Sequence, residues 1–173
     1  MGQLFFNVYL DTALHVSTAR IGALSATGQL LAIPAALIVP LLAARWGNGH
    51  TYMFGTLGMA ASLLPLALVP NWRAAALGYI GLIALASITR PAIGVYQMEI
   101  VSPNGRETMA AATTMALGLS WGLMALAGGH VITALGYRSF FLTGAGLSAA
   151  GALLFWIYFR TPRGEFAHSA SLD

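Results

Sequence analysis

Long stretches without a charged side chain constrain this chain more than any other feature. Between Ile21 and Phe159, several uninterrupted apolar blocks are separated by short polar links. A bilayer core about 30 Å thick needs about 20 helical residues to cross it. Only 8% of the residues are charged, whereas soluble domains carry about one quarter. The chain therefore has too little polar surface for a water-soluble globule, and lipid is the expected solvent.

We therefore predict an all-α membrane protein, a polytopic helix bundle with five full transmembrane helices and a truncated first one. The full spans are predicted at residues 21–44, 51–70, 74–98, 108–135 and 139–159, and the partial span at residues 4–10. Seven helical residues cover only about 10 Å, so the partial span is interpreted as the end of a helix whose beginning is missing. The short links, rich in glycine, proline and asparagine, make consecutive helices antiparallel neighbours.

Arginine distribution predicts the orientation of the bundle. One end carries Arg45, Arg106, Arg160 and Arg163, whereas the other carries Arg20, Arg73 and Arg138. Because cytoplasmic loops are enriched in basic residues, we expect the first group on the cytoplasmic side. This places the tail at residues 162–173 in the cytoplasm, after a transmembrane domain at residues 1–161, in a multi-pass plasma-membrane or inner-membrane protein.

The sequence lacks the residues that several classes of function require. The chain has no cysteine, and its four histidines are scattered, so neither a metal site nor a cofactor is expected. No basic patch indicates nucleic-acid binding. An intramembrane serine protease needs a serine and a histidine facing each other, and Ser148 is followed only by His168 in the tail. We therefore expect no enzyme activity.

Arg90 is the one clear charge at membrane depth. An arginine there costs about 2.5–3.5 kcal/mol on insertion scales, so it needs a partner or an aqueous cavity. At about 100° per residue, Gln97 lies on the same helix face as Arg90, whereas Glu99 lies on the opposite face. Arg90 and Gln97 border a hydrophilic cavity in one interpretation. In the other, Arg90 extends to the headgroups or bonds a neighbouring carbonyl.

Three further candidates for such a cavity are Asn7, Gln29 and Trp121, each in a different predicted helix. For each of them, interhelical hydrogen bonding or packing is the favoured explanation. Two pairs of small residues lie four positions apart, Gly58 with Ser62 and Gly118 with Gly122; we call each pair a small-residue step. Such pairs are typical of helix contacts in lipid.

A wider pattern resembles a known family. The run Pro103-Asn104-Gly105-Arg106, followed by Gly118, Gly122, Gly128-Gly129 and Phe140-Phe141, resembles the tenth-to-twelfth-helix region of major facilitator superfamily transporters. Residues 5–10 resemble the end of that family's seventh helix. Residues 40–49 take the place of its loop motif: Arg45 and Gly47 match, but Ala44 replaces the acidic residue, and Asn48 and Gly49 replace the basic pair.

The resemblance implies the C-terminal six-helix half of a secondary transporter, present here as a fragment. Such a protein moves a small solute by alternating access, for example as a drug or metabolite efflux carrier. Its partner would be the missing N-terminal half or a second copy. The cavity-lining helices would carry Asn7, Gln29, Arg90, Gln97 and Trp121. The alternative is a structural or assembly subunit of the membrane without transport activity.

Overall fold

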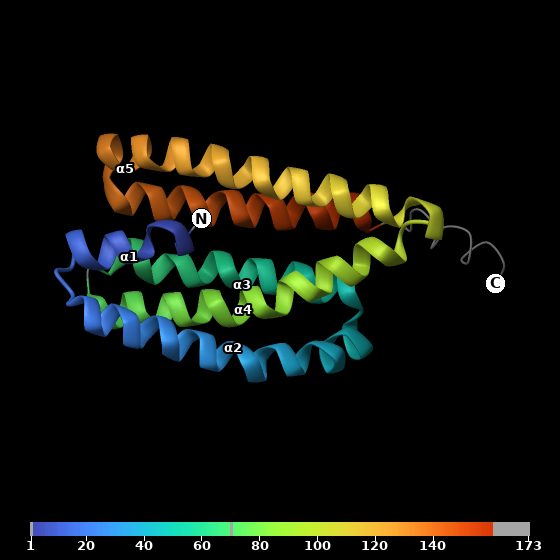
Figure 1. Ribbon diagram of the computed structural model, residues 1–173, viewed down its shortest axis with the longest axis horizontal. Coiled ribbons are helices and arrows are strands. Elements are labelled where there is room, and N and C mark those ends of the chain that lie inside the picture. The colour runs from blue at the N-terminus through green and yellow to red at the C-terminus, as the bar shows by residue number, and fades with distance from the viewer. Residues whose placement is uncertain (1, 70, 161–173) are drawn as a thin grey trace.

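The computed structural model describes residues 2–69 and 71–160, and within these ranges the chain folds into helices without strands. The elements are α1 (Gly2–Thr12), α2 (Thr18–Trp46), α3 (Asn48–Leu68), α4 (Trp72–Glu99), the short 3-10 helix η1 (Pro103–Gly105) and α5 (Arg106–Phe159). Figure 1 shows them as one elongated bundle. The predicted tail at residues 162–173 lies outside the described residues.

The longest element, α5, is a hairpin of two helices. Straight, its 54 residues would extend for about 80 Å, but the chain reverses direction at Gly136 (Figure 1). Gly136 has φ 77° and ψ 171°, a backbone conformation that residues with a Cβ atom rarely adopt. The break separates the two predicted blocks at residues 108–135 and 139–159.

The described part of the chain thus supplies the all-α polytopic bundle that the sequence predicts. Helices α2, α3, α4 and α5 are each long and apolar enough to cross a membrane, and α5 contains two such segments. With 11 residues, α1 reaches only about 16 Å and is shorter than the other α-helices.

Helices α1 to α5 each begin two or three residues before the corresponding predicted block. Helix α3 ends at Leu68, and Val69 is extended, with φ −117° and ψ 105°. A residue that precedes a proline disfavours the helical conformation, and position 70 is proline. The next helix, α4, begins where the Asn71 side chain accepts a hydrogen bond from the backbone N–H of Arg73 (3.0 Å).

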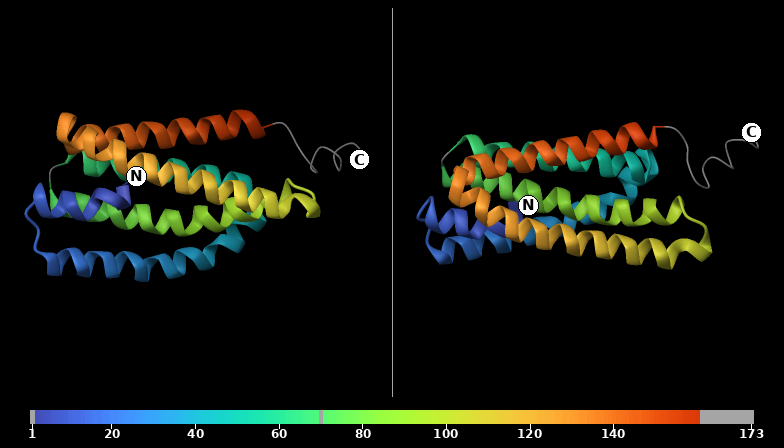
Figure 2. Two further views of the ribbon diagram at one scale, coloured as in Figure 1. Left: turned by 45° about the horizontal axis from the view of Figure 1, so that its top comes forward. Right: turned by 90° about the horizontal axis from the view of Figure 1, so that it is seen from above.

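Helices α3 and α4 form the centre of the bundle. Their axes approach closely because glycines face larger residues: a Cβ at Gly55 would lie 2.3 Å from Thr89 Cγ2, and one at Gly78 would lie 2.5 Å from the Ser62 carbonyl oxygen. Helix α2 packs on the other side of α4, and α5 packs on α3. Figure 2 shows the second half of α5 beside α3, and Figure 1 shows the first half of α5 on the side of the second half that faces away from α3 and α4.

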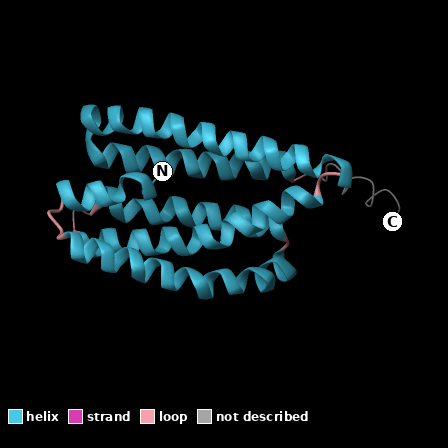
Figure 3. Cartoon of the chain, viewed as in Figure 1, coloured by secondary structure: helices cyan, strands magenta, loops and turns pink. Residues whose placement is uncertain are grey.

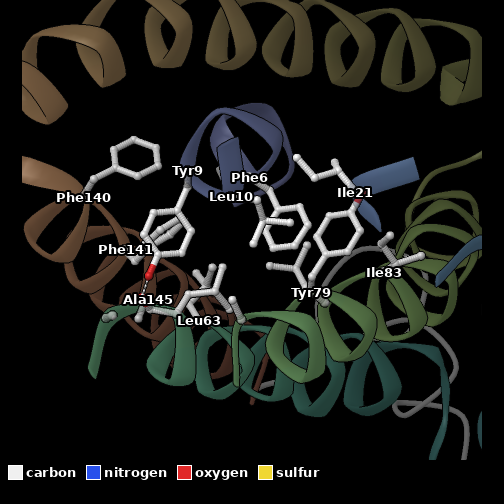
Figure 4. Close-up of a cluster of buried hydrophobic side chains, with 14 of the residues drawn as sticks. Phe6, Tyr9, Leu10, Ile21, Leu63, Tyr79, Ile83, Phe140, Phe141 and Ala145 are labelled. Carbon is white, nitrogen blue, oxygen red and sulfur yellow. Dashed lines mark hydrogen bonds between the residues drawn. The ribbon is translucent and has the colours of Figure 1, made fainter. Parts of the chain in front are cut away.

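An aromatic cluster fixes α1 to one end of the bundle (Figure 4). Phe6 stacks on Tyr79 of α4, and the Tyr9 hydroxyl donates to the Leu66 carbonyl of α3 at 3.3 Å. Phe140 and Phe141, just after the α5 turn, complete the cluster and are fully buried. Helix α1 is therefore held by three other helices at the end where α4 begins.

Candidate functional site

Along one face of α4, the side chains are buried in the first half of the helix and more exposed in the second half. Tyr79, Ile83, Ala86, Arg90 and Gln97 follow one another at helical spacing, so they form a single stripe. The first three are buried, whereas Arg90 is exposed and Gln97 is partly buried. The open part of the stripe is therefore also its polar part.

The position of α1 explains where this change occurs. Phe6 stacks on Tyr79, and α1 extends only four residues, or about 6 Å, from Phe6 to its first residue. Arg90 lies 11 residues, or about 16 Å, along α4 from Tyr79. Within the described chain, α1 thus packs on the first half of the stripe, at Tyr79.

Two of the other predicted residues lie on helices that touch α4. Asn7 is exposed on the side of α1 opposite to Tyr9, which points into the core. Gln29 is exposed directly after Gly28, whose Cα faces Ile83 so closely that a Cβ would lie 2.9 Å from Ile83 Cδ1. Both polar side chains are therefore exposed next to residues that pack against other helices.

Trp121 lies on the first half of α5, with 52% of its surface exposed. Figure 2 shows this half of α5 on one side of α1 and α4, with α2 on the other side. The five predicted residues thus lie on four helices, α1, α2, α4 and α5, and we call these five residues together the polar face. Of the five, Arg90 and Gln97 share a single stripe.

The two small-residue steps have different surroundings. Gly58 and Ser62 lie in the contact with α4: a Cβ at Gly58 would lie 2.9 Å from Leu85 Cδ1. By contrast, a Cβ at Gly118 or Gly122 would meet no atom within 4 Å. The second step is therefore not used for packing within the described part of the chain.

Glu99 has a partner that the sequence does not indicate. Its Oε1 accepts a hydrogen bond from Asn48 Nδ2 at 2.7 Å, which joins the end of α4 to the start of α3. The two residues are 51 positions apart, so no local pattern could reveal the pair.

In the part of the chain that the structure describes, no group of three histidine, aspartate or glutamate side chains could hold a metal ion. His130 on α5 instead contacts its own helix, with Nδ1 3.1 Å from the Leu126 carbonyl oxygen.

Comparison with known proteins gives one match. A family model described as Major Facilitator Superfamily matches residues 2–172, which is nearly the whole chain. No curated protein and no solved structure matches it.

Proposed function

Since the chain belongs to the major facilitator superfamily, a family of transporters, we propose that its polar face is one wall of a solute pathway. In this proposal the pathway opens alternately to the two sides of the membrane, and the chain acts as the C-terminal half of the carrier. A small solute would pass between this wall and a second set of helices.

One observation supports the proposal: polar side chains are exposed on three helices, two of which are long and apolar enough to cross a membrane. Arg90, Gln29 and Asn7 are exposed on α4, α2 and α1. Ionisable and polar side chains are costly against lipid tails and are found mostly toward bundle interiors or water-filled cavities. An aqueous pathway is the environment that makes this arrangement stable.

A second set of helices would complete the pathway. The first half of α5 is exposed over much of its surface, including the open step at Gly118 and Gly122. Small residues allow close helix approach in lipid. We propose the N-terminal six-helix half, or a second copy of this chain, as the body that packs there.

The same proposal sets the orientation. The end of the bundle that carries Arg45, Arg106 and Arg160 would lie at the cytoplasmic surface of the plasma membrane, with the C-terminus inside.

The chain offers a direct test because it contains no cysteine. Single cysteines would be introduced at Gln97 and at Val95, two residues apart and thus about 200° apart around α4. Val95 is half exposed but lies on the side away from Tyr79 and Arg90. A membrane-impermeant maleimide would then be added to membranes that contain each variant.

Gln97→Cys should be labelled at least about ten times faster than Val95→Cys, because the reagent needs a hydrated thiolate. Equal and slow labelling of both positions would contradict the proposal. That outcome would favour the structural or assembly subunit, whose helices need no aqueous face.

A further inference from the structure

The polar face carries a single charge, and its sign is positive. Arg90 is the only ionisable side chain among the five residues, and the others are three amides and the indole of Trp121. Arginine keeps its positive charge in proteins. The polar face therefore combines one cation with neutral groups that form hydrogen bonds.

The acidic residues lie far from this cation along the bundle. In the described chain they are Asp11, Glu99 and Glu107, each within one residue of a helix end. Figure 1 shows the end of α1 and the beginning of α5 at opposite ends of the bundle. Arg90 precedes the last residue of α4 by nine positions, or about 13 Å, and follows the first by 18 positions, or about 27 Å. No acidic residue of the described chain therefore lies at the depth of Arg90.

The helix surface next to Arg90 is open. Gly94 follows Arg90 by four residues, so it lies on the same face of α4, one helical turn farther along. A Cβ at Gly94 would meet no atom within 4 Å. Gln97 follows Gly94 by three residues, on the same stripe. Arg90 and Gln97 thus lie on either side of a position that has no side chain and has space around it.

We propose that the solute of this pathway is a small organic anion whose carboxylate or phosphate group binds Arg90 beside Gly94. This inference rests on the proposed function, because it names the class of solute for the same pathway. A guanidinium can donate two parallel hydrogen bonds to such a group, whereas a cationic solute is repelled by the same charge. The Gln97 amide would donate to a further oxygen of the solute.

The test measures the charge preference at Gly94 in the full chain, purified in an uncharged detergent. Gly94→Cys introduces a single thiol, because the chain contains no cysteine. Its labelling rates with the anionic sulfonatoethyl methanethiosulfonate and the cationic trimethylammonioethyl methanethiosulfonate are divided by the rates for free cysteine. For a reagent about 6 Å from a unit positive charge in water, Coulomb's law predicts a normalised ratio of about ten in favour of the anion.

Changes at two arginines assign this ratio to its cause. Arg90→Gln should lower the normalised ratio to about one, whereas Arg90→Lys should keep it, because the lysine retains the charge. Arg138→Gln is the matched control and should leave the ratio unchanged. Arg138 follows the turn of α5, at the end of the bundle where α4 begins (Figure 1).

A second readout tests the binding of the oxyanion itself. Acetate, inorganic phosphate or methylammonium is added to Gly94→Cys, with sodium chloride at equal ionic strength as the reference, and labelling by uncharged N-ethylmaleimide is followed. Acetate or phosphate should slow labelling with a saturating dependence on concentration, whereas methylammonium should not. Protection by acetate alone would assign a carboxylate, and protection by phosphate alone would assign a phosphate. Arg90→Lys should weaken this protection, because a lysine cannot donate two parallel hydrogen bonds.

The outcomes separate this inference from the pathway on which it rests. Labelling with a normalised ratio of about one or below, a ratio that persists in Arg90→Gln, or no protection by either oxyanion would overturn the anion preference. Each of these results would leave a hydrated pathway in place. Absence of labelling by every reagent would contradict the pathway and the inference together.

Discussion

Phe6 of α1 and Tyr79 of α4 stack face to face, with ring centroids 3.7 Å apart and ring planes within 2°. This contact fixes the short helix α1 against one half of α4. It leaves the other half, with Arg90 and Gln97, uncovered on the same face. The stack therefore separates the packed part of the bundle from the polar face.

Replacing Phe6 with alanine should loosen α1 without unfolding the bundle. Phe6 is fully buried, and the variant loses an aromatic contact of about 0.5–1.5 kcal/mol in addition to the packing of the ring. Hydrogen exchange in detergent should accelerate in residues 5–12 and stay unchanged in the centre of α3 and α4. Phe54→Ala, at a half-exposed phenylalanine on α3, is the control and should leave α1 protected. Unchanged exchange in α1 of the Phe6 variant would show that the stack does not hold the helix.

Gly78→Ala should lower the stability of the α3–α4 contact. Its Cβ would lie 2.5 Å from the backbone oxygen of Ser62, which cannot move aside like a flexible side chain. Overpacking of this kind costs about 1–3 kcal/mol. Gly94→Ala on the same helix meets no atom within 4 Å and should keep the parent Tm. Equal Tm values for both variants would argue against the close packing of these helices.

Gly136→Ala should strain the turn within α5. A residue with a Cβ at φ 77° and ψ 171° costs about 1–3 kcal/mol. The expected result is a lower Tm in detergent and faster exchange around residues 130–140. Gly146→Ala lies in the same helix with open space around it and serves as the comparison. A parent-like Tm for Gly136→Ala would contradict the turn geometry.

Asn48→Asp should separate the ends of α3 and α4. The change removes the Nδ2 donor and places a second carboxylate beside Glu99, where 2.7 Å now separates donor and acceptor. A loss of about 1–3 kcal/mol is expected from the lost bond and the repulsion. The decisive readout is the difference in Tm from Asn104→Asp, an exposed asparagine in η1. If the two variants melted together, the bond would contribute nothing.

The helices could be predicted from the sequence because the signal for a membrane helix is local. A run of apolar residues must form its hydrogen bonds internally in lipid, so each run predicts a helix without knowledge of its neighbours. Glycine and proline then mark the ends, as at Gly136 and at Val69, which precedes proline.

Contacts between helices could not be predicted in the same way. The face shared by Arg90 and Gln97 follows from helix periodicity alone, and the structure shows both on one stripe. The relation of Gln29 or Trp121 to that stripe depends on how α2 and α5 rotate about their axes, which no local pattern encodes. The same holds for Phe6 with Tyr79 and for Asn48 with Glu99, which meet across 73 and 51 positions. The small-residue step at Gly118 and Gly122 is the opposite case. Its pattern predicts a helix contact, but no helix of the described chain packs against these two glycines.

The central claim is that several helices turn their polar sides toward one aqueous space. The most direct measurement extends impermeant maleimide labelling to α2 and α5, with Gln29→Cys against Leu31→Cys and Trp121→Cys against Leu119→Cys. Each pair is two residues apart, so its members lie about 200° apart around their helix. We expect fast labelling at Gln29 and Trp121 and slow labelling at Leu31 and Leu119. Labelling that is equally slow at all four positions, or faster at the two leucines, would contradict the account.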